Sequence, residues 1–477
     1  MSSYDKLFEP ISLNGKLELK NRLVMSPMNL IMSDPEGFGD EQTHAWYVAR
    51  AKGGVSAIIT EATLPIADEW HGTSHTVNAR MSDLRYGRIF NEMVRAVHDY
   101  DCKVICQIMT GFGYQGKHHV ATGERSAAPS AVPHKVDMRY SARAFYKGLK
   151  ARFPEEIKLL DLDVVEKMTD EEYYPFEKLM YDIIGQRSPK IRSLIDGEVP
   201  RELEHHEIVY LEDKFAEAAL LVKEMEGDGV ELHASHGYLG GNFLSPRTNK
   251  RTDEYGGSLE NRARHIINML RKARQACGED FCIGIRVSGD EELPDGIHHE
   301  EVLELLGMCQ PYIDYINTSA GCYDACNNMF PSKDNVMNKH AKSFKSNFNV
   351  PVIVPAIHNP DNAVKAVDEG VTDIVSLARA VIADQDWPNK VKAGRVKDIV
   401  KCTRCCNCLL SIFEATKISC TVNPTVGYEK YLPELWRVNS PTYGLKVERF
   451  LKKRAGLYDE TGALAAGLRD ETEALVK

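Results

Sequence analysis

Short apolar runs alternate with amphipathic stretches along most of the chain. The runs 23–29 and 57–62 each end in polar or small residues, and an Ala- and Arg-rich stretch of helical periodicity, 41–53, lies between them. Six further runs have the length of buried strands, and they cover residues 103–109, 229–233, 282–287, 312–317, 350–355 and 373–377. Alternation of strands and helices with short connections predicts a parallel sheet, and eight strands suit a closed barrel. We therefore predict an α/β fold of the eight-fold β/α (TIM) barrel type.

The composition describes an ordinary globular protein. Hydrophobic residues make up 43% and charged residues 27% of 477 residues, which allows a sizeable core. The net charge of −10 argues against nucleic acid or an anionic membrane as the main partner. The polar N-terminus lacks the apolar segment of a signal peptide, and no apolar run reaches membrane-spanning length. We expect a cytoplasmic homo-oligomer that binds neither nucleic acid nor membranes.

The stretch 233–262 carries the densest chemistry of the chain. His233, His236 and Tyr238 directly follow the apolar run 229–232, so they lie where a strand ends and a loop begins. In a β/α barrel the carboxyl ends of the strands form the catalytic face. Two imidazoles three residues apart, followed by a phenol, can hold one oxygen and deliver one proton.

Five of the twelve cysteines are clustered near the end of the chain. They are Cys402, Cys405, Cys406, Cys408 and Cys420. In a reducing cytosol such clustering indicates metal binding rather than disulfides. Four thiolates in one compact run suit either a [4Fe–4S] cluster or a tetrahedral zinc ion, and the spacing alone does not separate the two. The seven scattered cysteines are expected to be plain thiols.

Two further segments need an interpretation. Residues 111–116 match the Gly-x-Gly-x-x-Gly fingerprint of dinucleotide sites, but no helical pattern follows that would direct an N-terminus at a pyrophosphate, so we expect an active-site loop. Residues 133–197 form an insertion after the third strand, with helical spacing at 176–184. Because a long segment inside a compact domain is usually functional, we predict a partly helical lid over the substrate. The alternative is a surface excursion or a subunit contact.

The motifs of 233–262 resemble those of the Old Yellow Enzyme family of flavin-dependent ene-reductases. The resemblance rests on His-x-x-His-Gly-Tyr-Leu, then Ser-Pro-x-x-Asn-x-Arg-x-Asp-Glu-Tyr-Gly-Gly-Ser-x-Glu-Asn-Arg, and it covers about residues 4–430. It implies the same barrel, FMN as the cofactor and reduction of a C=C bond conjugated to a carbonyl. It also implies that His233 and His236 hold the carbonyl oxygen and that Tyr238 protonates carbon.

The same resemblance implies a flavin site at the strand ends. In the family these positions line the ring, bond its pyrimidine side, place positive charge beside it and hold the phosphate after strands seven and eight. The residues of this chain at the matching positions are Pro27, Met28, Asn29, Ala62, Gln107, Arg286, Ala356, Ile357, Ala378 and Arg379. The family usually has Gly at both of the phosphate-site alanines, so Ala356 and Ala378 are departures from the family pattern.

The cysteine run resembles the iron–sulfur branch of this family, which includes 2,4-dienoyl-CoA reductase and trimethylamine dehydrogenase. The resemblance implies a [4Fe–4S] cluster on Cys402, Cys405, Cys408 and Cys420, while a frame with Cys406 in place of Cys408 stays open. In this branch the cluster receives electrons from a C-terminal FAD and NAD(P)H domain. We expect that domain to be absent here, with a separate flavoprotein or ferredoxin as the donor, so that NAD(P)H acts directly or indirectly.

These interpretations divide the chain into three parts: an FMN-binding barrel at 1–400, a cluster-binding segment at 401–430 and a helical tail at 431–477. The predicted function is FMN- and [4Fe–4S]-dependent reduction of an enone, enoate or enoyl thioester. One alternative is an amine dehydrogenase, although Asn29 stands where trimethylamine dehydrogenase has the cysteine that bonds to FMN. The other alternative is an electron-transfer subunit of a larger flavoprotein complex.

Overall fold

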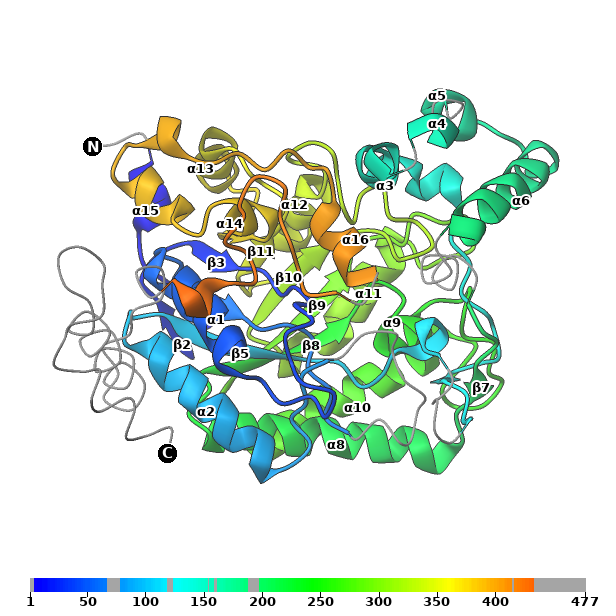
Figure 1. Ribbon diagram of the computed structural model, residues 1–477. Helices are drawn as coiled ribbons and strands as arrows, with labels where there is room; N and C mark the ends of the chain where they lie inside the picture. The colour runs from blue at the N-terminus through cyan, green and yellow to red at the C-terminus, as the bar shows by residue number, and fades with distance from the viewer. Residues whose placement is uncertain are drawn as a thin grey trace, which may run out of the picture.

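Eight parallel strands close into a barrel in chain order (Figure 1). The structure, a computed structural model, describes residues 4–66, 78–117, 123–152, 154–157, 161–187, 197–413 and 416–432. The barrel strands are β3 (Leu23–Met25), β4 (Ala57–Ile59), β5 (Lys103–Ile108), β8 (Gly229–Ala234), β9 (Cys282–Ser288), β10 (Tyr315–Ser319), β11 (Val352–Val354) and β12 (Ile374–Leu377). Each strand lies within or across an apolar run predicted from the sequence, and the predicted barrel is confirmed.

Helices surround the barrel and bury their apolar faces against it (Figure 1). They are α1 (Glu41–Lys52), α2 (Leu84–His98), α8 (His205–Glu224), α10 (Leu259–Cys277), α11 (His299–Cys309), α12 (Asn338–Asn347), α13 (Pro360–Asp368), α14 (Arg379–Ala383) and α15 (Trp387–Lys392). Helix α10 shows the local rules: Ser258 caps its first turn, and Gly278 ends it at φ +80°. Within the part of the chain that is described, no helix is both long and apolar enough to cross a membrane.

Side chains along β8 and β9 point alternately to the outer core and to the barrel interior. Val230 and Leu232 belong to the apolar layer under the helices, whereas Glu231 and His233 are the alternate residues of the same strand and face the interior. On β9, Gly284 is required because a Cβ there would lie 2.1 Å from the ring of Tyr315. The strands thus bring polar groups into the middle of an otherwise apolar barrel.

A short hairpin closes the end of the barrel where the strands begin. It consists of β1 (Ile11–Leu13) and β2 (Leu17–Leu19), which pair in antiparallel register. Its leucines form one apolar cluster with barrel residues near the starts of the strands, including Val24, Ala57 and Cys282. The hairpin was not predicted from the sequence, and it leaves the opposite end of the barrel for the site.

The insertion after β5 is largely helical and lies to one side of the barrel (Figure 1). It contains α3 (Met138–Arg152), α4 (Pro154–Ile157), α5 (Leu162–Val165) and α6 (Asp170–Arg187), and the pair β6 (Ala127–Ala128) and β7 (Arg201–Glu202) flanks it. The predicted helical stretch 176–184 lies within α6. Met138 and Phe145 of α3 pack in one apolar cluster with Cys406 and Leu410 of the cysteine segment.

A buried ion pair fastens the segment after the cysteines to the barrel. Arg50 of α1 and Glu429 of η6 (Glu429–Tyr431) are each 1% exposed and lie 2.7 Å apart. Glu429 also accepts hydrogen bonds from the side chain of Gln42 and the backbone of Gly427, both at 2.9 Å. Arg50 stacks on Trp46 at 3.3 Å. The predicted helical tail lies, from residue 433 onward, outside the described residues.

Glu61 follows β4 and holds the loop that follows β3. Its carboxylate accepts the backbone N–H of Leu30 at 3.1 Å, while its own N–H donates to the hydroxyl of Tyr47 at 3.0 Å. The other carboxylate oxygen is buried without a hydrogen bond, and Glu61 is among the residues that line a small cavity of about 60 Å³ between α1, α2 and the end of β4. Burial raises the pKa of Glu61 to about 7, so this carboxyl binds a proton in the folded protein near neutral pH.

We expect Glu429→Gln to lower the free energy of unfolding by about 3–5 kcal/mol, because it leaves the buried guanidinium of Arg50 without a counter-charge. Urea unfolding at pH 7 measures the change. The control is Arg95→Ala, which breaks an exposed pair with Glu226 and should have little effect. Equal effects of the two substitutions would contradict a special role for the buried pair.

We expect Glu61→Gln to remove a pH dependence of stability. In the unfolded chain a glutamate has a pKa of about 4.3. Between that pH and 7 the folded state therefore binds more protons than the unfolded state, and stability is lost as the pH rises through the folded pKa. Gln does not ionise. The variant should therefore gain about 2–3 kcal/mol relative to the parent between pH 5 and pH 8. Glu304→Gln, exposed on α11, is the control, and parallel pH curves for the parent and Glu61→Gln would contradict the raised pKa.

Candidate active site

A cavity of about 230 Å³ lies at the carboxyl ends of the barrel strands. Most residues that the sequence assigned to catalysis and FMN binding line it, namely Pro27, Met28, Asn29, Ala62, Gln107, His233, His236, Tyr238, Arg286, Ala356, Ala378 and Arg379. Ile357 does not, because its side chain packs fully buried in the outer core. The loop 111–116, expected near the active site, contributes Phe112 and Gln115.

The two histidines form a buried, uncharged pair. Nδ1 of His236 lies 3.3 Å from Nε2 of His233, and Nε2 of His236 lies 2.6 Å from the hydroxyl of Ser319 on β10. Burial lowers the pKa of His233 to about 3, with the charge of Arg286 as the second cause, and lowers the pKa of His236 well below its usual value. Both rings are therefore neutral near pH 7, and each carries one N–H donor.

A left-handed turn connects the second histidine to the tyrosine. His236 has φ +63° and Gly237 has φ +73°, and helix α9 (Leu239–Leu244) begins directly after Tyr238. A Cβ on Gly237 would lie 2.5 Å from the hydroxyl of Tyr114, so only glycine fits there. This turn keeps both imidazoles and the phenol on the wall of one cavity.

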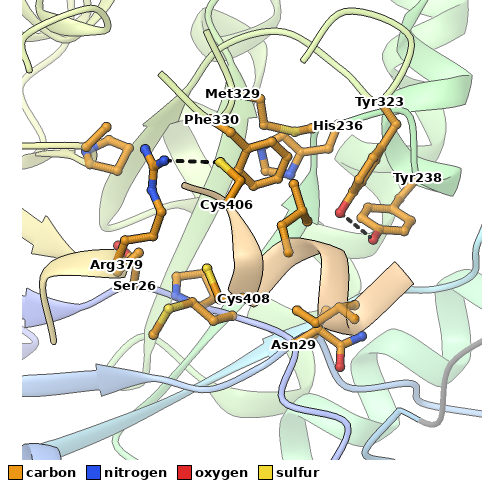
Figure 2. A pocket seen from close by; sticks show the side chains of 18 of the residues that line it. Ser26, Asn29, His236, Tyr238, Tyr323, Met329, Phe330, Arg379, Cys406 and Cys408 are labelled. Atoms are coloured by element: carbon orange, nitrogen blue, oxygen red, sulfur yellow. Dashed lines mark hydrogen bonds between the residues drawn. The ribbon is translucent and has the colours of Figure 1, made fainter. Parts of the chain in front are cut away.

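Tyr238 faces a second phenol across the cavity wall. Its hydroxyl donates to the hydroxyl of Tyr323 at 3.3 Å, and the two rings meet edge to face at 5.6 Å (Figure 2). The ring of Tyr238 also contacts His233 at 5.1 Å. The sequence analysis did not name Tyr323. Its position just beyond the end of β10 could have indicated it, because the active sites of β/α barrels lie at the carboxyl ends of the strands.

Two buried charged groups lie at the bottom of the site: Arg286 lines the cavity, and Glu231 is fully buried below it. Glu231 accepts hydrogen bonds from Gln107 at 2.6 Å and from Tyr315 and Asn317 at 2.9 Å each. Burial raises the pKa of Glu231, and the charge of Arg286 opposes that rise. The Nε of Arg286 is buried without a hydrogen bond. A buried guanidinium with an unused donor on the cavity wall fits an electron-rich ring edge, as a flavin would present.

Cationic and polar groups gather at another end of the cavity. Arg379 donates to the backbone oxygen of Pro331 at 2.9 Å and to the sulfur of Cys406 at 3.5 Å (Figure 2). Nδ1 of His358 is buried without a hydrogen bond. Ala356 has φ +66°, a conformation in which glycine costs less by about 1–2 kcal/mol. The donors fit a phosphate, and Ala356 holds a left-handed backbone conformation beside them.

The clustered cysteines line a small hollow beside the main cavity. Cys402, Cys405, Cys406, Cys408 and Cys420 all border it, and Cys406 and Cys408 also line the main cavity. Burial opposes ionisation of Cys405, but hydrogen bonds led by Thr421 lower its pKa below the usual value. Over the described ranges, no three Cys, His, Asp or Glu side chains are arranged to hold a metal ion. The donor set suits a cluster, although the thiols do not converge.

The remaining wall of the cavity is apolar. Residues of the insertion, of the loop after β10 and of α16 (Asn407–Phe413) form it, namely Val136, Met138, Phe145, Met329, Phe330, Leu409, Leu410 and Ile412. Among the described residues that line the cavity, none is Asp, Glu or Lys. The sequence analysis named none of these side chains individually. The seven cysteines outside the cluster are all buried, as expected for plain thiols.

The chain resembles flavin enzymes over most of its length. The profile of the NADH:flavin oxidoreductase / NADH oxidase family matches residues 6–158 and 169–398. An NADH oxidase of Thermoanaerobacter brockii is 32% identical over 442 residues, which are 91% of this chain and 58% of that protein. A cinnamate reductase of Clostridium sporogenes is 28% identical over 94% of this chain and 60% of that protein. The chain thus spans less than two thirds of the length of these relatives.

Solved structures give the same result. A 2-naphthoyl-CoA reductase in complex with 2-naphthoyl-CoA superimposes with a TM-score of 0.71 at 25% identity, over 90% of this chain and 58% of that one. Morphinone reductase superimposes with a TM-score of 0.60 at 22% identity, over 82% and 91%, which shows the shared barrel. The family match covers well over half of the residues and coincides with the barrel that carries the cavity. The chain therefore belongs to the NADH:flavin oxidoreductase / NADH oxidase family.

Proposed function

We propose that this protein is an FMN-dependent ene-reductase that reduces a C=C bond conjugated to a carbonyl. The observation that carries the proposal is the wall of one cavity on which His233, His236 and Tyr238 lie together with the flavin-binding positions. Relatives named for the reduction of cinnamate and 2-naphthoyl-CoA support it. Enones, enoates and enoyl thioesters all present the oxygen and the double bond that this site needs.

The residues of the cavity have separate roles in this reaction. FMN, when bound, supplies the hydride to the carbon β to the carbonyl. The neutral imidazoles of His233 and His236 donate hydrogen bonds to the carbonyl oxygen and stabilise its growing negative charge. Ser319 engages Nε2 of His236, which leaves Nδ1 on the side of His233. Burial raises the pKa of Tyr238, so the phenol retains its proton at pH 7 and can deliver it to the α-carbon.

The apolar wall favours a substrate with an apolar body. The side chains of Met138, Phe145, Phe330 and Leu410 border the space beyond the phenols, and no carboxylate or ammonium among the described lining residues offers a counter-charge. Burying apolar surface contributes about 25 cal/mol per Å². An aryl or ring-fused substrate would therefore bind more tightly than a short-chain enone of the same reactivity.

The cysteine segment is proposed to hold a [4Fe–4S] cluster through Cys402, Cys405, Cys408 and Cys420. The support is the common hollow that these thiols border and its position against the flavin cavity. Cys406 is not assigned as a ligand, because its sulfur accepts a hydrogen bond from Arg379 and its side chain packs in an apolar cluster with residues of the insertion. The cluster would pass electrons to the flavin.

Amine oxidation on the same barrel is the second candidate. Aromatic rings at Phe112, Phe145, Tyr238, Tyr323 and Phe330 line the cavity, and such rings can bind cations. A dimethylamine dehydrogenase of Hyphomicrobium is 31% identical over 48% of this chain. Against it, the buried guanidinium of Arg286 lies on the wall of the same cavity, and its positive charge would repel an ammonium. Bleaching of the flavin by dimethylamine under anaerobic conditions would favour this alternative.

We expect Tyr238→Phe to slow substrate reduction by about 10²–10⁴-fold and to leave flavin reduction unchanged, because only substrate reduction uses the proton of Tyr238. The protein is reduced anaerobically with NAD(P)H or dithionite and then mixed with an aryl enone in a stopped-flow spectrometer. Both rates are read from the flavin absorbance. Equal slowing of both rates would remove Tyr238 from the acid role.

We expect Cys408→Ser to remove the iron and Cys406→Ser to retain it, because the sulfur of Cys406 is engaged by Arg379. Iron and acid-labile sulfide are quantified on protein purified anaerobically, with FMN content as the check that the barrel is intact. The reverse result would assign the ligand frame to Cys406. Iron at background level in the parent protein would refute the cluster.

A further inference from the structure

We propose that Tyr323 is a positioning residue for the proton transfer, because its hydroxyl donates to the Tyr238 oxygen as Tyr238 gives up its proton. The inference rests on the proposed ene-reductase function and adds a second phenol to the acid. It starts from the 3.3 Å contact between the two hydroxyls, which lies on the wall of the same cavity as His233 and His236 (Figure 2).

The loop after β10 holds Tyr323 against the catalytic turn. The backbone N–H of Tyr323 donates to the backbone oxygen of His236 at 3.3 Å, next to an isolated bridge between His236 and Cys322. The hydroxyl of Ser288 donates to the backbone oxygen of Gly321 at 2.7 Å and fixes the start of the loop. The end of β10 thus supplies Ser319, which orients His236, and the loop that follows supplies Tyr323, which faces Tyr238.

Delivery of a proton from Tyr238 creates a buried negative charge. Bringing such a charge into an apolar wall is costly unless hydrogen bonds or opposite charges compensate it. The titratable and charged groups around Tyr238 include Tyr323, Arg286, Cys326 and the neutral ring of His233, and of these only Tyr323 is hydrogen-bonded to its oxygen. Burial raises the pKa of Tyr238, and the hydrogen bond with Tyr323 and the charge of Arg286 both lower it.

Each proton in the step has a donor and an acceptor. The O–H bond of Tyr238 breaks, and a C–H bond forms at the α-carbon of the substrate. The hydroxyl of Tyr323 rotates, so that it donates to the Tyr238 oxygen instead of accepting from it. The negative charge is then shared by the hydrogen-bonded pair, and a proton from solvent restores Tyr238 after the product leaves.

The test compares Tyr323→Phe with Tyr255→Phe, which removes another buried phenol whose hydroxyl donates to Glu212, away from the cavity. We expect Tyr323→Phe to slow substrate reduction by about 10- to 100-fold, the size of a lost hydrogen bond to a charged group. Flavin reduction and FMN content should stay as in the parent protein. The alkaline limb of the substrate-reduction rate should move to higher pH, since the phenolate of Tyr238 loses its donor. Tyr255→Phe should change neither rate.

A double variant separates positioning from packing. Because Tyr323 acts through Tyr238, Tyr238→Phe combined with Tyr323→Phe should be no slower than Tyr238→Phe alone. Additive slowing, with a loss of FMN, would show that Tyr323 only packs against Phe330, whose ring lies 6.3 Å away. A parent-like rate for Tyr323→Phe, when Tyr238→Phe is slow, would overturn the inference and leave the proposed function standing.

A third measurement does not depend on turnover. Tyrosinate absorbance is titrated in the FMN-loaded protein, and Tyr323→Phe should raise the pH at which the Tyr238 signal, identified by its loss in Tyr238→Phe, develops. An unchanged titration would overturn the inference. Failure of the parent protein to reduce any enone would count against the proposed function, while this titration would still decide whether the two phenols are coupled.

Discussion

A carboxylate buried in the middle of the barrel constrains everything above it. Glu231 faces the interior from β8, where an uncompensated charge would be prohibitive. Donors from β5 and β10 reach it through Gln107, Tyr315 and Asn317, and Arg286 of β9 supplies the opposing charge. These contacts fix four neighbouring strands in register at the floor of the cavity. The same arginine then influences each group of the proposed reaction: it favours neutral histidines and lowers the pKa of Tyr238.

The two ends of the barrel are specialised by different means. At one end the leucines of β1 and β2 pack in an apolar cluster against the starts of the strands. At the other end the loops after β8 and β10 are cross-linked by backbone contacts between His236 and Tyr323, so the side chains above them are held without help from a ligand. Pre-positioning of this kind reduces the reorganisation that a reaction in a buried site requires.

Local patterns in the sequence predicted the barrel and the histidine motif because each depends on residues that are close in the chain. Strand runs, the cap at Ser258 and the turn through His236 and Gly237 all have local signals. Contacts between distant residues had none: Tyr315 reaches Glu231 across 84 positions, and Arg50 reaches Glu429 across 379. Ile357 shows what a motif leaves open, because a position carried over from a family does not say which way its side chain points, and this side chain packs in the outer core.

The insertion and the cysteine segment share one apolar cluster, and the ammonium of Lys147 on α3 donates to the backbone oxygen of Thr403 at 3.1 Å. Neither segment is therefore an independent module. Removal of the insertion would strip one face of the cysteine loop, and a transplanted cysteine loop would lose the apolar surface on which it packs. Evolution, or an engineer who wishes to alter substrate range through this insertion, must change the two segments together.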